Sequence, residues 1–127
     1  MTEILHVHEP VILNSLNATD REHMRAIQES MEAVTQRQFF GTAASLFNDH
    51  PIRVAAKTGT VQIDGQLIND AVFIAYAPAP APEIAVSVVV ELGGSGAAIM
   101  DIARNVIDHY FRDGVSVLTA PFGELIP

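Results

Sequence analysis

A lysine inside an apolar strand pattern is the feature that most constrains how this chain can fold. Residues 54–62 read Val-Ala-Ala-Lys-Thr-Gly-Thr-Val-Gln, and these β-branched and small side chains are typical of a β-strand. Lys57 is the only lysine in the chain. Because an unpaired buried charge costs several kcal/mol or shifts its pKa, the ammonium group must stay in water or against an anion. Lys57 is therefore the first candidate functional residue.

The residues after Lys57 add two hydroxyl groups and a position without a side chain to the same strand. Thr58 and Thr60 carry the hydroxyls, and Gly59 stands between them. A glycine weakens a strand and often marks a place where a ligand or another backbone comes close. The simpler alternative is a solvated lysine on an edge strand, which discourages pairing between sheets.

Composition excludes several classes of function. The formal net charge is −8 with only 7 Lys and Arg residues, so we expect no nucleic-acid partner, which would need clustered cations. Without cysteine there is no disulfide framework and no thiolate metal site. No stretch approaches the roughly 18 uninterrupted apolar residues of a membrane span, and the first residues lack a signal-peptide pattern.

The 127 residues predict a single unit that begins with an extended lead-in and a helix. The lead-in covers residues 1–18. The sequence Thr-Asp-Arg-Glu at 19–22 reads as a capping box, so we expect a helix over 20–36. Met24, Ile27, Met31 and Val34 follow at near-helical spacing, and the stripe of Met24 and Met31 is predicted to face the core.

A three-stranded meander is predicted over residues 53–92. The first strand runs over 53–63, and Asp64-Gly65 predicts a two-residue hairpin, because both central residues of the favoured turn have positive φ. The second strand runs over 67–77 and leads into a stiff Ala-Pro connection.

The third strand and a second helix complete the pattern. Residues 84–91 are apolar nearly throughout, so this strand should be covered on both faces. Apolar residues at helical spacing then predict a helix over 97–111. The order helix, strand, strand, strand, helix with short connections predicts an α+β fold, an antiparallel β-meander with helices on both faces.

Four blocks of sequence occur in an informative order. They are the Lys-Thr-Gly strand, Phe73 to Ala79, Ile84 to Glu91, and Gly93-Gly94-Ser95-Gly96 before a helix. Lys-Thr-Gly is one of the boxes of a serine acyl-transfer site. Together the blocks resemble the C-terminal part of the transpeptidase domain of class B penicillin-binding proteins, the elongation-type D,D-transpeptidases. The resemblance covers roughly residues 20 to 111 and implies a partial penicillin-binding, β-lactamase-like fold.

The resemblance assigns a role to each residue of the strand. Lys57 would face the pocket of an active site at the edge of a five-stranded sheet. The Thr58 and Thr60 hydroxyls would bind the carboxylate of the stem peptide or of a β-lactam. Gly59 would let the substrate backbone approach, and the Thr60 N–H would supply one oxyanion donor. The peptide would dock as an added strand.

The family's nucleophile box, Ser-x-x-Lys, is absent from this chain, since Val54 stands three residues before Lys57. Ser15-Leu16-Asn17 spells Ser-x-Asn, but it lies nearer to Lys57 than the family places that box and is interpreted as loop. The chain alone is therefore predicted to be catalytically inactive. The missing N-terminal half of the domain would be its partner, in a parent enzyme that acts outside the cytoplasmic membrane.

Two other functional readings stay open. The chain could be a non-catalytic module that binds β-lactams reversibly, or a scaffold that self-associates through the uncovered edge of the strand at 84–91. No cofactor or metal is expected. Gly93 to Gly96 lacks the third glycine of a dinucleotide loop, and no third ligand accompanies His6 and His8.

Overall fold

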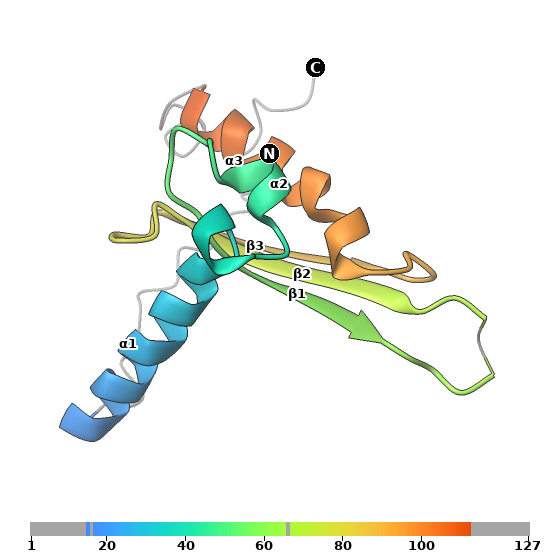
Figure 1. Ribbon diagram of the computed structural model, residues 1–127, viewed down its shortest axis with the longest axis horizontal. Coiled ribbons are helices and arrows are strands. Elements are labelled where there is room, and N and C mark those ends of the chain that lie inside the picture. Colours follow the sequence, from blue (N-terminus) through green and yellow to red (C-terminus); the bar gives the residue numbers. More distant parts are fainter. Residues whose placement is uncertain (1–14, 16, 66, 113–127) are drawn as a thin grey trace, which may run out of the picture.

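A three-stranded antiparallel sheet with helices on both faces forms the chain (Figure 1). The structure, a computed structural model, describes residues 15, 17–65 and 67–112. In chain order the elements are α1 (Ala18–Ala33), the 3₁₀ turn η1 (Arg37–Phe39), α2 (Ala44–Phe47), β1 (Ala55–Val61), β2 (Asp70–Ala77), β3 (Ile84–Val90), the 3₁₀ turn η2 (Gly96–Ala98) and α3 (Met100–Arg112). The predicted α+β meander is confirmed. Nearly all of the expected lead-in, including His6 and His8, lies outside the described residues.

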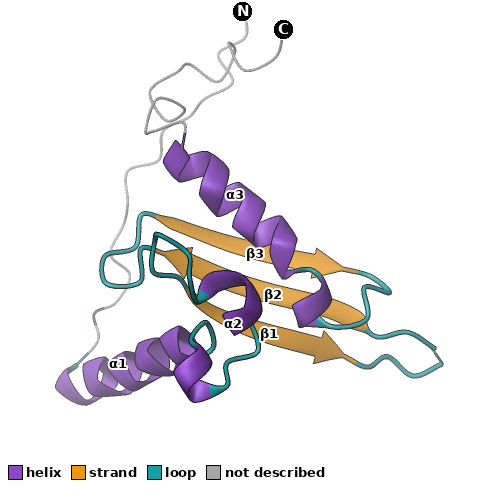
Figure 2. Cartoon of the chain, turned by 45° about the horizontal axis from the view of Figure 1, so that its top comes forward, coloured by secondary structure: helices purple, strands orange, loops and turns teal. Residues whose placement is uncertain are grey.

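One face of the sheet, which we call the core face, carries the hydrophobic core. On it Thr58 of β1 pairs with Phe73 of β2, and Phe73 pairs with Val88 of β3. Phe73 and Ile107 of α3 are the largest fully buried side chains. The ring of Phe47, from α2, stacks on Phe73 with 6.2 Å between centroids. Figure 2 shows α2 and α3 lying over this face.

The opposite face, which we call the lysine face, carries Lys57, Ile74 and Ser87 at paired positions. Helix α1 contributes several residues to a groove along this face, together with Lys57 and Ile74. None of the residues of α1 is buried, and Ile27 is 50% exposed. The prediction that the stripe of Met24 and Met31 faces the core was wrong, because α1 projects away from the sheet (Figure 1) and Met24 is 41% exposed. Val34, just beyond α1, does pack against the core.

Helix α1 also begins and ends earlier than predicted. Asn17 is its N-cap, and the Asn17 Oδ1 accepts a hydrogen bond from the Asp20 N–H at 2.9 Å. The capping box at Thr19 was therefore wrong, which agrees with the stronger capping preference of asparagine over threonine. The helix ends at Ala33, and the next carbonyl, that of Val34, accepts a bond from the Ala43 N–H at 2.9 Å.

The predicted two-residue hairpin at Asp64-Gly65 was wrong. Pairing between β1 and β2 stops at Val61 and Asp70, so residues 62–69 form the connection. Gly65 has a φ of 84°, but the φ of Asp64 is not positive. This end of the hairpin projects beyond the helices (Figure 1), so extending the strands into it would bury little apolar surface.

Strand β3 is not covered on both faces, contrary to the prediction. Its burial alternates along the strand, and Val89 is 65% exposed. Helix α3 packs on the core face of β3, whereas Ala85, Ser87 and Val89 on the lysine face are open. The strand order β1-β2-β3 also makes β3 an edge strand among the described residues.

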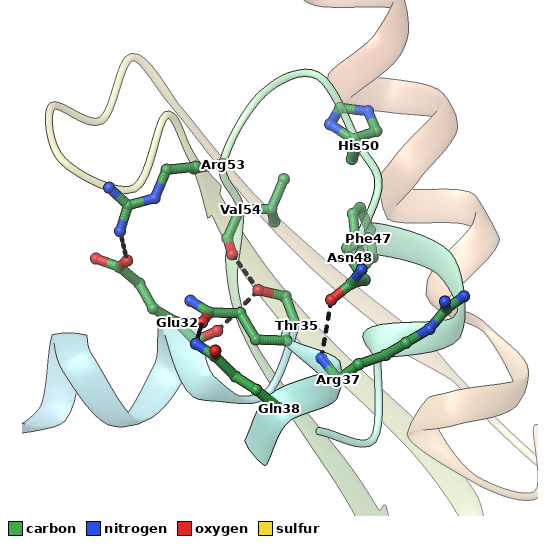
Figure 3. Close-up of a pocket in the computed structure, with 10 residues that line it drawn as sticks. Glu32, Thr35, Arg37, Gln38, Phe47, Asn48, His50, Arg53 and Val54 are labelled. Atoms are coloured by element: carbon green, nitrogen blue, oxygen red, sulfur yellow. Dashed lines mark hydrogen bonds and ion pairs between the residues drawn. The ribbon is translucent and has the colours of Figure 1, made fainter. Parts of the chain in front are cut away.

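Two contacts tie the end of α1 to the start of β1 (Figure 3). The buried Thr35 Oγ1 lies 2.7 Å from the carbonyl oxygen of Val54 and 2.8 Å from that of Glu32. Arg53 forms an ion pair with Glu32. The side chains that converge here hold residues 53 and 54, which lead directly into the lysine-bearing strand.

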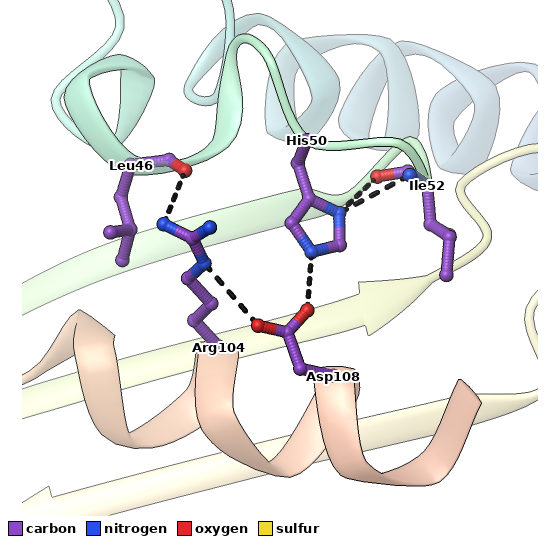
Figure 4. A network of polar contacts seen from close by, with 5 residues as sticks. All are labelled: Leu46, His50, Ile52, Arg104 and Asp108. Carbon is purple, nitrogen blue, oxygen red and sulfur yellow. Dashed lines mark hydrogen bonds and ion pairs between the residues drawn. The ribbon is translucent and has the colours of Figure 1, made fainter. Parts of the chain in front are cut away.

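A histidine clasp, formed by His50, Asp108 and Arg104, holds the loop that precedes β1 against α3 (Figure 4). The His50 side chain is 1% exposed. Its Nε2 lies 2.7 Å from Asp108 Oδ1, and its Nδ1 lies 2.8 Å from the carbonyl oxygen of Ile52. Arg104 Nε lies 3.4 Å from Asp108 Oδ2. The hydrogen bond from His50, aided by the charges of His50 and Arg104, holds the pKa of the Asp108 carboxyl below its ordinary value of 3.8.

The clasp predicts a pH-dependent loss of stability in the Asp108→Asn variant. Since the folded-state pKa of Asp108 is lowered, its stabilisation is complete above the unfolded value and is lost as the pH falls through the lowered pKa. We expect the variant to lose about 1 kcal/mol of unfolding free energy at pH 7, and to approach the wild type in strong acid. Urea unfolding of the chain at several pH values measures this.

Asp101→Asn is the matched control, because it removes the same charge from the first turn of the same helix. A loss of stability at Asp108 that is no larger than at Asp101, or that does not shrink in acid, would show that the clasp does not stabilise the fold.

Candidate functional site

All four predicted site residues lie on β1, which is an edge strand of the described sheet. Side chains alternate along a strand, so Lys57 and Gly59 belong to the lysine face, while Thr58 and Thr60 belong to the core face. The structure therefore brings the ammonium group and the two hydroxyls to one edge, but on opposite sides of it. The Lys57 Nζ donates a hydrogen bond to the carbonyl oxygen of Thr58.

The backbone of β1 presents donors at its open edge. Gly59 pairs with Val72. The Gly59 N, the Gly59 O and the Val72 O all lie within 2.8 Å of the position that a Cβ atom on Gly96 would take, so the Gly59 N and the Val72 O face each other across the ladder. Gly59 is therefore the inward, hydrogen-bonded member of the ladder. Because successive residues of a strand direct their N–H and C=O groups to opposite sides, those of Thr58 and Thr60 point outward.

Gly96 approaches this part of β1 closely, although the sequence analysis assigned it no role beyond ending a strand. Gly96 is buried in η2, and a methyl group there would lie 2.3 Å from the Val72 O and 2.7 Å from the Gly59 N. Another backbone thus comes close to Gly59, but the missing side chain of Gly59 does not make room for it, since the three atoms nearest to a Cβ there all belong to Val72. The partner lies 37 residues further along the chain, and only a glycine allows it.

Thr42 is the second residue that the sequence analysis missed. Its Oγ1 lies 3.3 Å from the Thr58 Oγ1. Thr42 lies between Gly41 and the buried Ala43, in the connection that leads into α2. A hydroxyl group therefore stands beside the Thr58 hydroxyl on the core face, and nothing in the local sequence pattern around either residue indicates the contact.

The groove beside Lys57 is mostly apolar. Its volume is about 560 Å³, and the lining residues are Ala26, Ile27, Ser30, Met31, Val34, Lys57 and Ile74. Lys57 is the only charged residue among them. Further along the lysine face the Tyr76 hydroxyl is buried and has no hydrogen-bond partner within the described part of the chain. Burial, with a smaller effect from Glu32, raises the pKa of Tyr76.

Other polar positions do not join this site. The pocket in Figure 3, of about 550 Å³, is lined by side chains that largely pair with one another. Asn17, from the Ser-x-Asn triplet, caps the start of α1. That helix has 16 residues, which corresponds to about 24 Å in length, and its first turn points away from the sheet (Figure 1).

Comparison with known proteins identifies the family. The penicillin binding protein transpeptidase domain matches residues 8–108, so the chain belongs to this family. It is 32% identical over 83 residues to the peptidoglycan D,D-transpeptidase MrdA of Escherichia coli K12, a match that covers 54% of this chain and 13% of that protein. It is 31% identical over 118 residues to penicillin-binding protein 2A of Bacillus subtilis, covering 82% of this chain and 16% of that protein.

Solved structures agree with this assignment. Penicillin-binding protein PBP2 of Helicobacter pylori, in a complex with MreC, is similar with a TM-score of 0.69 and 25% identity, covering 78% of this chain and 18% of that one. PBP2 of Pseudomonas aeruginosa, in complex with WCK 5153, gives a TM-score of 0.68 and 28% identity, covering 81% and 23%. The chain thus spans less than a quarter of the length of each of these relatives.

The contact between η2 and β1 predicts that Gly96→Ala disturbs the site strand. The added methyl group overlaps backbone atoms, so we expect a loss of about 1–3 kcal/mol in unfolding free energy. We also expect the amide chemical shifts of Gly59 and Thr60 to change. Urea unfolding and amide NMR spectra of the chain measure the two effects.

Gly65→Ala serves as the control. Its methyl group would meet nothing within 4 Å, although the φ of 84° makes the substitution strained. It should therefore cost stability without moving the Gly59 and Thr60 amide signals. Unchanged stability and unchanged signals in Gly96→Ala would rule out the tight packing of Gly96 on β1.

Proposed function

We propose that this chain supplies the substrate-binding strand of a peptidoglycan D,D-transpeptidase, which cross-links stem peptides by serine acyl transfer. The observation that carries the proposal is the open edge of β1 in a member of this family. That edge combines the Lys57 ammonium, the hydroxyls of Thr58 and Thr60, and an outward Thr60 N–H. Extended peptides bind to such edges as an additional strand.

Each residue then has a definite task. The peptide backbone lies along β1, and Thr58 and Thr60 donate hydrogen bonds to its terminal carboxylate. Lys57 provides positive charge beside the reacting group. A serine oxygen attacks the carbonyl carbon, and the Thr60 N–H donates to the oxyanion that develops. The serine's proton passes through the base to the departing amine as the acyl-enzyme forms. An amine of a neighbouring strand then displaces the serine oxygen, which takes the proton that this amine gives up.

The serine and its base must come from residues outside this sequence, because no Ser-x-x-Lys box is present. We place the remaining part of the domain over the lysine face, where Ile27 and Val89 are exposed and the Tyr76 hydroxyl is unpartnered within the described residues. This chain alone would then be inactive. The parent protein would act on the outer side of the cytoplasmic membrane. Among the described helices, none is both long and apolar enough to cross a membrane.

β-Lactams are the second class of ligand that we assign to this edge. Penicillin-binding protein A of Mycobacterium tuberculosis, solved as an imipenem acyl-enzyme complex, is 32% identical to this chain with a TM-score of 0.52, covering 68% of this chain and 19% of that one. A self-associating scaffold remains a second candidate, favoured by the open edge of β3 and the exposed Val89.

Labelling with a fluorescent penicillin tests the proposal. The chain is exposed to the probe alone and after refolding with the polypeptide that precedes it in the complete protein. We expect label only in the mixture, and only on the preceding polypeptide. Lys57→Ala should slow labelling by about 100-fold, whereas Arg25→Ala, which removes an exposed cation from α1, should leave it unchanged.

A mixture that folds but never labels would contradict the transpeptidase proposal. Reversible binding of the same probe without a covalent product would instead support a non-catalytic binding module.

A further inference from the structure

We propose that Thr42 is a positioning residue for Thr58, whose hydroxyl it orients toward the carboxylate of the bound peptide or β-lactam. This inference rests on the proposed function, in which Thr58 is a carboxylate-binding residue. Thr42 itself would touch no substrate atom. Within the described residues it is the only hydrogen-bond partner of the Thr58 hydroxyl, at 3.3 Å between the two Oγ1 atoms.

The backbone on both sides of Thr42 is hydrogen-bonded and packed against the end of α1. The Gly41 N–H donates to the Gln36 carbonyl at 3.1 Å, and the Ala43 N–H donates to the Val34 carbonyl at 2.9 Å. Ala43 has no exposed surface. A methyl group on Gly41 would lie 2.2 Å from the Val34 oxygen, so the loop packs directly on the end of α1. The Thr42 side chain therefore starts from a fixed position.

Hydroxyl chemistry sets the direction of the bond. Each threonine hydroxyl has one proton and two acceptor lone pairs. When Thr58 donates its proton to a carboxylate, its oxygen can still accept, and Thr42 is placed to donate. The resulting chain runs from the Thr42 hydroxyl to Thr58 and on to the carboxylate, and each bond in such a chain polarises the next.

The 3.3 Å separation of the two Oγ1 atoms leaves room for the contact to shorten. Hydroxyl pairs usually lie 2.7–2.8 Å apart, so this contact is long. Catalytic hydrogen bonds often tighten only in the complex. Thr42 is exposed and Thr58 half-buried, so neither hydroxyl is needed to satisfy a buried group, and the contact has no evident role in the core.

The experiment measures acylation of the complete protein that carries this chain by a fluorescent penicillin and by its carboxylate methyl ester. Dissociation constants and acylation rate constants are determined separately for the wild type, Thr42→Val, Thr42→Ser and Ser45→Ala. Ser45 is an exposed hydroxyl residue on α2. The ratio of free acid to ester within one variant does not depend on how much of that variant is folded.

We expect Thr42→Val to weaken binding of the free acid by about fivefold and to leave binding of the ester nearly unchanged. Thr42→Ser, which keeps the hydroxyl, should restore most of the difference, and Ser45→Ala should match the wild type. Equal effects of Thr42→Val on acid and ester, or no effect on either, would overturn the positioning role. A wild-type protein that is never acylated would overturn the proposed function itself, and the role of Thr42 with it.

Discussion

The structure depends on keeping one lysine at a strand edge. Lys57 is the only lysine, and its strand is otherwise apolar or small-sided, so the ammonium must reach solvent or an anion. The open lysine face of β1 meets that requirement, and the position of β1 at the edge of the described sheet leaves the N–H groups of Thr58 and Thr60 unpaired by β2. Among the described residues, β1 then has a neighbouring strand on one side only, and the core packs on only one of its faces. Phe73, Ile107 and the ring of Phe47 do this on the core face.

Predictions that relied on local patterns were largely correct. The helices, the three strands and their antiparallel order follow from apolar spacing, and the family follows from four ordered blocks. Errors arose at two local signals, the capping box at Thr19 and the hairpin at Asp64-Gly65, and where a pattern required knowledge of what covers it. The continuous apolar run of β3 predicted cover on two faces, and the stripe on α1 predicted burial, but this chain provides neither. The hairpin failed because Gly65 has a positive φ and Asp64 does not.

The residues proposed for the candidate site come from the sequence, whereas the contacts that support them do not. Lys57, Thr58, Gly59 and Thr60 are neighbours in sequence, so a short motif identifies them. Gly96 and Thr42 lie in two separate connections and both contact β1. Gly96 packs on the backbone at Gly59, and Thr42 contacts the Thr58 hydroxyl. Such contacts leave no periodic signal. They become visible only when the register of β1 against β2 and the course of the loops are known.

The most direct test of the account is a crystal structure of the complete protein acylated by a β-lactam. The account predicts that the ligand lies along the open edge of β1, with its carboxylate within hydrogen-bond distance of the Thr58 and Thr60 hydroxyls. Its acyl oxygen should accept from the Thr60 N–H. A ligand bound elsewhere, or another strand of the protein paired to this edge, would contradict the claim that β1 is the substrate-binding strand.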